Sequence, residues 1–101
     1  MDFSEVLTAI REWLGRAAVP AQVQRDAADG LWVFFESENA LAEVIVGNDV
    51  YAPWHFVSMT VLDTRLPPHA APVFTFWGNG DHTVSDILRE LDRAMELFGA
   101  L

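Results

Sequence analysis

The sequence predicts an α+β fold, a two-layer sandwich in which an antiparallel sheet of four to five strands carries an N-terminal and a C-terminal helix. Apolar residues recur at helical spacing near both ends of the chain, and strand-like segments separated by turn residues fill the middle. The connections between these segments are short, which makes neighbouring strands antiparallel. Because each helix has one apolar stripe, we expect both helices to pack on the same face of the sheet.

The chain of 101 residues suits a single domain, residues 1–101, because a chain of this length builds one hydrophobic core. Hydrophobic residues make up 51% of the chain and charged residues 21%, a balance that excludes a disordered protein. No apolar run approaches the ~20 residues that cross a bilayer, and the acidic N-terminus lacks the basic region of a signal peptide. We therefore expect a cytoplasmic protein. The absence of cysteine excludes disulfides and thiolate metal sites.

The first predicted helix covers residues 2–17, whose apolar side chains share one face. Asp2 or Ser4 is available as its N-terminal cap. Pro20 prevents the helix from continuing, because proline lacks the amide hydrogen that a helix interior needs.

The middle of the chain contains five segments rich in branched and aromatic residues, and each predicts a strand. Small and acidic residues at 26–30 and 37–39 predict tight turns between the first three strands, which suggests a meander. Prolines make residues 67–72 a stiff loop before the last strand. The predicted strands are residues 21–25, 31–36, 41–46, 54–62 and 73–77.

The second helix is predicted over residues 84–98, where apolar side chains again form one stripe. Thr83 and Asp86 have the spacing of a capping box, in which each side chain accepts from the other residue's amide. Gly99 stands where a left-handed C-terminal cap is expected.

The order of these elements, a helix, four or five strands and a second helix, resembles that of the type III secretion chaperones and related small chaperone-like domains. The resemblance is one of topology. As an alternative function, a chaperone-like dimer would shield a client protein on its sheet.

No motif for catalysis, cofactor binding or metal binding stands out in the sequence. His55, His69 and His82 have none of the spacings that place two imidazoles on one face for a metal. His82 lies between an acidic and a hydroxyl residue, but contiguous residues do not converge as a catalytic triad does. We expect a non-enzymatic protein with no catalytic residue, cofactor or metal.

Charge is distributed unevenly along the chain. The net charge is −9, and all six basic residues are arginines, so we expect no direct nucleic-acid binding and no membrane binding. The interval between Arg25 and Arg65 has no lysine or arginine and contains seven acidic residues, which we expect to stand unopposed: Asp26, Asp29, Glu36, Glu38, Glu43, Asp49 and Asp63. Two interpretations stay open, solubility through net charge and a negative field that steers a basic partner.

Aromatic residues are frequent in the predicted strands, and alternation along a strand prevents all of them from facing the helices. We expect some of Trp32, Phe34, Trp54, Phe56 and Trp77 to reach the other face of the sheet, where a partner or a second copy covers them.

Together, the acidic and aromatic residues predict a protein-binding domain that inhibits or sequesters a partner with a basic surface, such as a nucleic-acid-binding protein. Small acidic inhibitors encoded by phages or mobile elements, and immunity proteins that block a toxin, are similar in size and charge. A homodimer is a further possibility. The predicted partner-binding residues are Asp26, Asp29, Glu36, Glu38, Asp49, Trp32, Trp54, Phe56 and Trp77.

Overall fold

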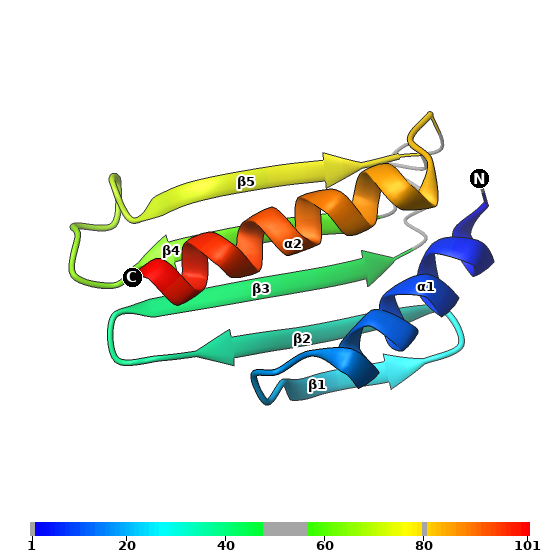
Figure 1. Ribbon diagram of the computed structural model, residues 1–101, viewed down its shortest axis with the longest axis horizontal. Helices are drawn as coiled ribbons and strands as arrows, with labels where there is room; N and C mark the ends of the chain where they lie inside the picture. Colours follow the sequence, from blue (N-terminus) through cyan, green and yellow to red (C-terminus); the bar gives the residue numbers. More distant parts are fainter. Residues whose placement is uncertain (1, 48–56, 80) are drawn as a thin grey trace.

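The computed structural model describes residues 2–47, 57–79 and 81–101, and it has the predicted α+β fold (Figure 1). A helix comes first, five strands follow, and a second helix ends the chain. The elements are α1 (Phe3–Arg16), β1 (Gln22–Ala27), β2 (Gly30–Glu36), β3 (Ala40–Gly47), β4 (Val57–Asp63), β5 (Pro72–Gly78) and α2 (Val84–Ala100).

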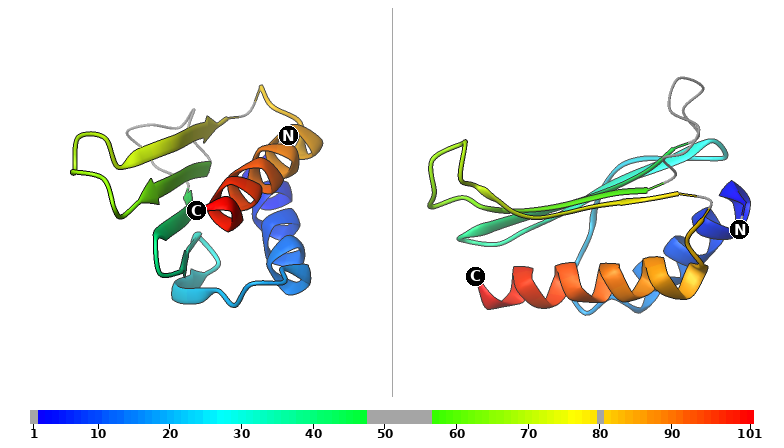
Figure 2. Two further views of the ribbon diagram at one scale, coloured as in Figure 1. Left: turned by 60° about the vertical axis from the view of Figure 1, so that its left-hand side comes forward. Right: turned by 90° about the horizontal axis from the view of Figure 1, so that it is seen from above.

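The five strands form one sheet in the order β1-β2-β3-β4-β5, and every neighbouring pair is antiparallel. The meander predicted for the first three strands is confirmed, and it continues through β4 and β5. Both helices lie on the same side of the sheet, as expected, so the described residues place no helix over the opposite side (Figure 2).

The core lies between the helices and the sheet. Alternate residues of the three central strands point toward the helices, and α1 and α2 each contribute one apolar stripe. Phe35 of β2 is at the centre of this layer, where its ring lies 6.2 Å from that of Trp13 and 6.4 Å from that of Phe98. The largest fully buried side chains are Phe35, Ile10, Met59, Ile87 and Leu91.

Capping boxes begin both helices. The Asp2 side chain accepts a 2.9 Å hydrogen bond from the amide of Glu5, whose carboxylate accepts one from the amide of Asp2. The Thr83 hydroxyl accepts a 3.1 Å bond from the amide of Asp86, and Asp86 accepts a 3.0 Å bond in return. The predicted box at the start of α2 is therefore confirmed, and Asp2 rather than Ser4 caps α1.

The predicted end of α2 is wrong. The helix continues through Gly99 to Ala100, and no glycine among the described residues has a positive φ. Gly99 therefore forms no left-handed cap, and the amide of Leu101 bonds to the carbonyl of Phe98 instead. Apolar packing explains the extension, because Phe98 is buried in the core and holds the last turn against the sheet.

The strands differ from their predicted bounds by a few residues, as is usual where pairing decides the ends. β1 runs two residues further than predicted and ends at Ala27, and β5 begins at Pro72, which was assigned to the loop. β4 is described from Val57 onward, so the beginning of the predicted strand 54–62 lies outside the described residues.

Candidate protein-binding face

The side of the sheet that has no helix over it is the main candidate surface. Its residues alternate along each strand with the buried residues of the core, and cross-strand pairing places them on one side. We call this surface the open face, and it comprises Gln22 and Arg25 of β1, Trp32, Phe34 and Glu36 of β2, Leu41, Glu43 and Ile45 of β3, Ser58, Thr60 and Leu62 of β4, and Thr75 and Trp77 of β5.

One row of the open face crosses four strands. Trp32 pairs with Ile45, Ile45 with Ser58, and Ser58 with Trp77. The exposed fractions are 42% for Trp32, 37% for Ile45 and 59% for Trp77. At roughly 4.8 Å per strand, the row spans about 14 Å. Trp32 and Ile45 are thus neighbours, Ser58 separates them from Trp77, and all three large apolar side chains are exposed to solvent, where such side chains are favoured as anchors for a protein partner.

Glu43 fixes one of these tryptophans. Its Oε2 accepts a 2.9 Å hydrogen bond from Nε1 of Trp32, and Glu43 lies directly opposite Phe34 in the neighbouring strand. The bond satisfies the polar atom of the indole and leaves its apolar ring exposed. A carboxylate therefore lies among the aromatic side chains of the open face.

The predicted aromatic site residues have different outcomes. Trp32 and Trp77 lie on the open face as expected, and Phe34 lies there half-buried. Trp54 and Phe56 lie outside the described residues. The prediction missed Ile45 and Glu43 as members of this surface, because their positions beside Trp32 follow from strand register, which the sequence does not display.

The acidic interval is not unopposed, which corrects the expectation from sequence. Arg11 of α1 bonds Asp26 at 2.7 Å, Arg25 bonds Asp29 at 2.7 Å, and Arg65 bonds Asp63 at 3.0 Å. Of the three arginines, Arg11 comes from α1, and Arg25 and Arg65 are the limits of the interval. The fold brings Arg11 across because α1 packs on the face of the sheet toward which Asp26 points.

The remaining predicted acidic residues differ in where they lie and in whether they are ion-paired. Glu36 and Glu38 are exposed, and neither is ion-paired within the described part of the chain. Both lie at the β2–β3 turn, whereas Asp26 and Asp29 lie at the β1–β2 turn, about 20 Å away along β2. Asp49 lies outside the described residues. The acidic residues therefore form two groups at opposite ends of β2 and not one patch.

Asp63 is a structural residue at the end of β4. Its carboxylate accepts from the amide, Nε and Nη2 of Arg65, at 3.0 Å in each case, although only 7% of the residue is exposed. The Arg65 side-chain bonds and then its amide hold the pKa of Asp63 below the usual value of 3.8. Asp63 thus closes the loop before β5.

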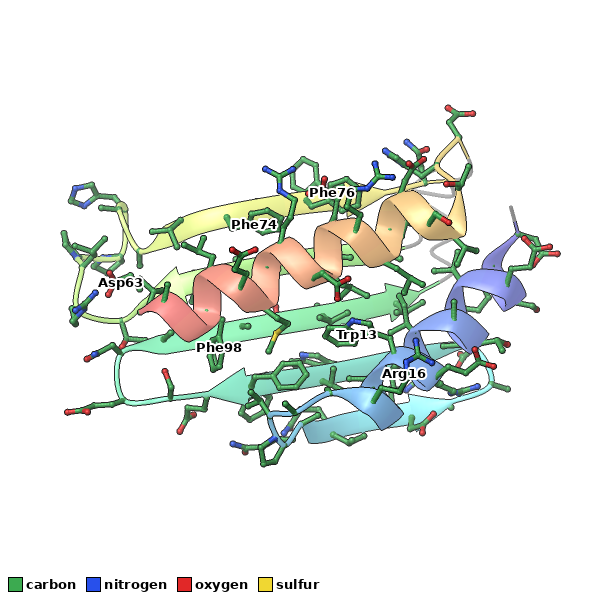
Figure 3. The ribbon with its side chains drawn as sticks, viewed as in Figure 1. Trp13, Arg16, Asp63, Phe74, Phe76 and Phe98 are labelled. Atoms are coloured by element: carbon green, nitrogen blue, oxygen red, sulfur yellow. The ribbon has the colours of Figure 1, made fainter. Side chains whose placement is uncertain are left out.

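A second candidate lies in the helical layer, in a groove of about 550 Å³ between the end of α1 and α2 (Figure 3). Leu88 and Met95 form its apolar side, and Arg16 and Glu96 stand at the rim. Nε1 of Trp13 donates a 3.0 Å bond to Asp92 there. These groups fit a structural contact between the helices and do not form an acid, base and nucleophile set.

The two described histidines, His69 and His82, lie in different parts of the structure. His82 precedes α2, where its Nδ1 accepts a 3.1 Å bond from the amide of Asn79 and its ring packs 5.2 Å from that of Phe76. His69 is exposed in the loop before β5, and His55 lies outside the described residues. Over residues 2–47, 57–79 and 81–101, no three histidine or acidic side chains gather as they would around a metal ion.

No helix in the described part of the chain is both long and apolar enough to span a membrane. Comparison with protein-family models, with curated proteins and with solved structures finds no match for this chain.

Proposed function

We propose that this chain is a non-enzymatic, acidic protein-binding domain that sequesters or inhibits another protein through the open face of its sheet. One observation carries the proposal: the row of Trp32, Ile45 and Trp77 exposes large apolar side chains on a face that neither of the described helices, α1 and α2, covers. Solvent-exposed groups of this kind mark interaction surfaces on soluble proteins.

Charge supports a basic partner. The chain has a net charge of −9, and Glu36, Glu38 and Glu43 have no arginine partner within the described residues. Glu43 lies within the open face and Glu36 at its end. An arginine of the partner that reaches Glu43 would at the same time lie beside the ring of Trp32, a favourable place for a guanidinium group. The ion-paired Asp26 and Asp29 contribute less to this attraction than the sequence suggested.

The test compares the proteins captured by three purified baits, the unmodified protein and two variants. Ile45→Lys places a positive charge in the centre of the open face, where it repels a basic partner and removes an apolar anchor. Val23→Lys is the matched control, because Val23 is also exposed, at 56%, but lies on edge strand β1 opposite the buried Val33. Both variants should keep the circular dichroism spectrum of the unmodified protein.

We expect to capture a folded partner protein. It should bind to the unmodified bait and to the Val23→Lys bait, but not to the Ile45→Lys bait. Its affinity for the purified bait should fall as salt is added, because salt screens the attraction between charged surfaces. Equal retention by Ile45→Lys and the unmodified bait would show that the open face is not the binding surface.

A chaperone-like protein that shields an unfolded client is the second candidate. The row on the open face favours it, because exposed apolar side chains spread across four strands suit an extended client segment as well as a folded surface. The two candidates differ in the state of the captured protein. Binding to its folded form supports the inhibitor, whereas binding to its unfolded form with little effect of salt supports the chaperone.

A further inference from the structure

The two edges of the sheet differ in how well they are protected from pairing with another strand. An unprotected edge strand offers free amide and carbonyl groups to any chain that can approach it. β1 and β5 form the edges, since each pairs with one neighbour in the sheet.

β1 is protected in three ways. Its register shifts between Val23 and Arg25, and it contains the charged residues Arg25 and Asp26. In addition, Arg11 of α1 donates a hydrogen bond to the side chain of Asp26. Arg11 also donates a 2.7 Å bond to the carbonyl of Ala27, the last residue of the strand. A bulge, charges and a covered carbonyl are features by which natural proteins prevent edge pairing.

β5 lacks this protection over most of its length. It pairs regularly with β4 from Phe74 to Gly78, and its one register shift lies at its beginning. Each of the other four strands has at least one charged residue, whereas β5, Pro72–Gly78, has none. No described strand or helix lies along its outer edge (Figure 1).

The absence of charge matters because two copies of this chain repel each other. Each copy has a net charge of −9, so close approach is least unfavourable where charged groups are missing. The edge of β5 is such a place. The same feature makes β5 less suited to a basic partner than to a second neutral, apolar strand.

We propose that two copies of the chain associate through their β5 strands, antiparallel to each other, about a two-fold axis at Thr75. Thr75 is the middle residue of β5. This axis places Thr75 opposite its own copy, and it places Phe74 of each copy opposite Phe76 of the other. Threonine pairs and aromatic pairs are favourable directly across antiparallel strands.

The side chains of Phe74 and Phe76 favour this arrangement in addition to the backbone pairing of the two strands. Both are half-buried side chains on the helix side of β5, and they lie beside α2 at the outer margin of the core (Figure 3). Pairing with the second copy would bury them further. The interface is isologous, so it closes at two copies, and the two sheets join into one of ten strands whose open faces lie on the same side.

The test is the mass in solution, measured by sedimentation over a range of concentrations. The unmodified protein should show twice the 11.3 kDa of one chain, and salt should strengthen the dimer because it screens the repulsion between two acidic copies. This salt dependence is opposite to that expected for a basic partner on the open face. A monomer at concentrations up to about 100 µM, in low and in high salt, would overturn the proposal.

A matched pair of variants locates the interface. Thr75→Lys places two lysines opposite each other at the axis and should weaken the dimer at least about tenfold. Thr60→Lys is the control, because Thr60 is the direct partner of Thr75 on the same face but belongs to the interior strand β4. An unchanged dimer in Thr75→Lys, or equal weakening by both variants, contradicts pairing at β5.

Cysteine chemistry gives an independent measurement, since the chain has no cysteine of its own. In Thr75→Cys the two thiols would lie opposite each other at the axis, near enough for an intermolecular disulfide under mild oxidation. In Thr60→Cys they would be separated by three strand spacings, about 14 Å, and should not react. A cross-link in Thr60→Cys but not in Thr75→Cys would indicate contact between open faces and overturn the edge-to-edge dimer.

Discussion

Trp13 and Asp92, 79 residues apart in the sequence, join the two helices through a 3.0 Å hydrogen bond from the indole Nε1 to Oδ1 of the carboxylate. The ring of Trp13 is buried and packs edge-on against Phe35 of the sheet. The same side chain therefore fixes α1 to the core and, through its polar atom, to α2.

Removal of the carboxylate tests this link. Asp92→Ala should lower the free energy of unfolding by about 1 kcal/mol, because it leaves the indole donor of Trp13 without its partner. Glu96→Ala is the control, since Glu96 lies on the same helix and groove and changes the net charge equally. Urea unfolding of the two variants gives the comparison. Equal stability of Asp92→Ala and Glu96→Ala would mean that the bond contributes nothing measurable.

Leu91 tests the stripe of α2, because it is fully buried between that helix and the sheet. Leu91→Ala should cost about 2 to 5 kcal/mol of unfolding free energy through lost burial and the cavity that remains. Leu66→Ala removes the same atoms from a loop side chain that is 41% exposed, and it should cost less than about 0.5 kcal/mol. Denaturant unfolding measures both, and similar values for the two would contradict the packing of α2.

Gly99 tests the corrected end of α2. It is helical, and a Cβ added there would meet nothing within 4 Å. Gly99→Ala should therefore raise the melting temperature and stabilise the protein by up to about 1 kcal/mol, because alanine is the better helix residue. A left-handed glycine at this position would give the opposite sign, so a loss of stability would restore the cap that the sequence predicted.

Asp63 predicts a pH dependence. Because its pKa is lowered in the folded protein, the carboxylate contributes stability that is fully present above the unfolded value near 3.8 and is lost as pH falls through the lower folded value. Asp63→Asn should be less stable than the unmodified protein at neutral pH, and the difference should shrink below pH 3.8. Chemical denaturation at several pH values measures this.

Arg65→Met tests whether Arg65 causes this pH dependence, since the Arg65 side chain is the main source of the lowered pKa of Asp63. In an Arg65→Met background, the loss of stability caused by Asp63→Asn should depend less on pH. A stability difference that stays constant from neutral pH to well below 3.8 would show that Asp63 does not titrate as its contacts indicate.

Association kinetics distinguish the two interpretations of the acidic residues, attraction of a basic partner and solubility through net charge. Once a partner is identified, Glu36→Gln with Glu38→Gln should lower its association rate more than it changes the dissociation rate. Glu12→Gln with Glu96→Gln changes the net charge equally but lies on the helices, and it should have the smaller effect. Stopped-flow measurements at low salt give both rates. Equal rates for the two double variants would mean that the acidic residues serve solubility alone.

Local patterns determined much of this protein from the sequence. The capping boxes of Asp2 and Thr83 involve residues three apart, and alternation within β2 and β4 decides which side chains face the core, so each is visible in a short window. The same alternation predicted that some of the strand aromatics face away from the helices, and Trp32 and Trp77 do so. The α+β class followed because periodicity and turn residues are also local properties.

Tertiary structure decided what depends on residues far apart in the chain. Packing of α1 pairs Arg11 with Asp26, which removes part of the negative field that the sequence suggested. Packing of Phe98 carries α2 past Gly99, where local preference predicted an end. Strand register sets Ile45 and Ser58 between two tryptophans, and strand order leaves the uncharged β5 at an edge. Such relationships arise from contacts across the whole sheet, and no short stretch of sequence contains them.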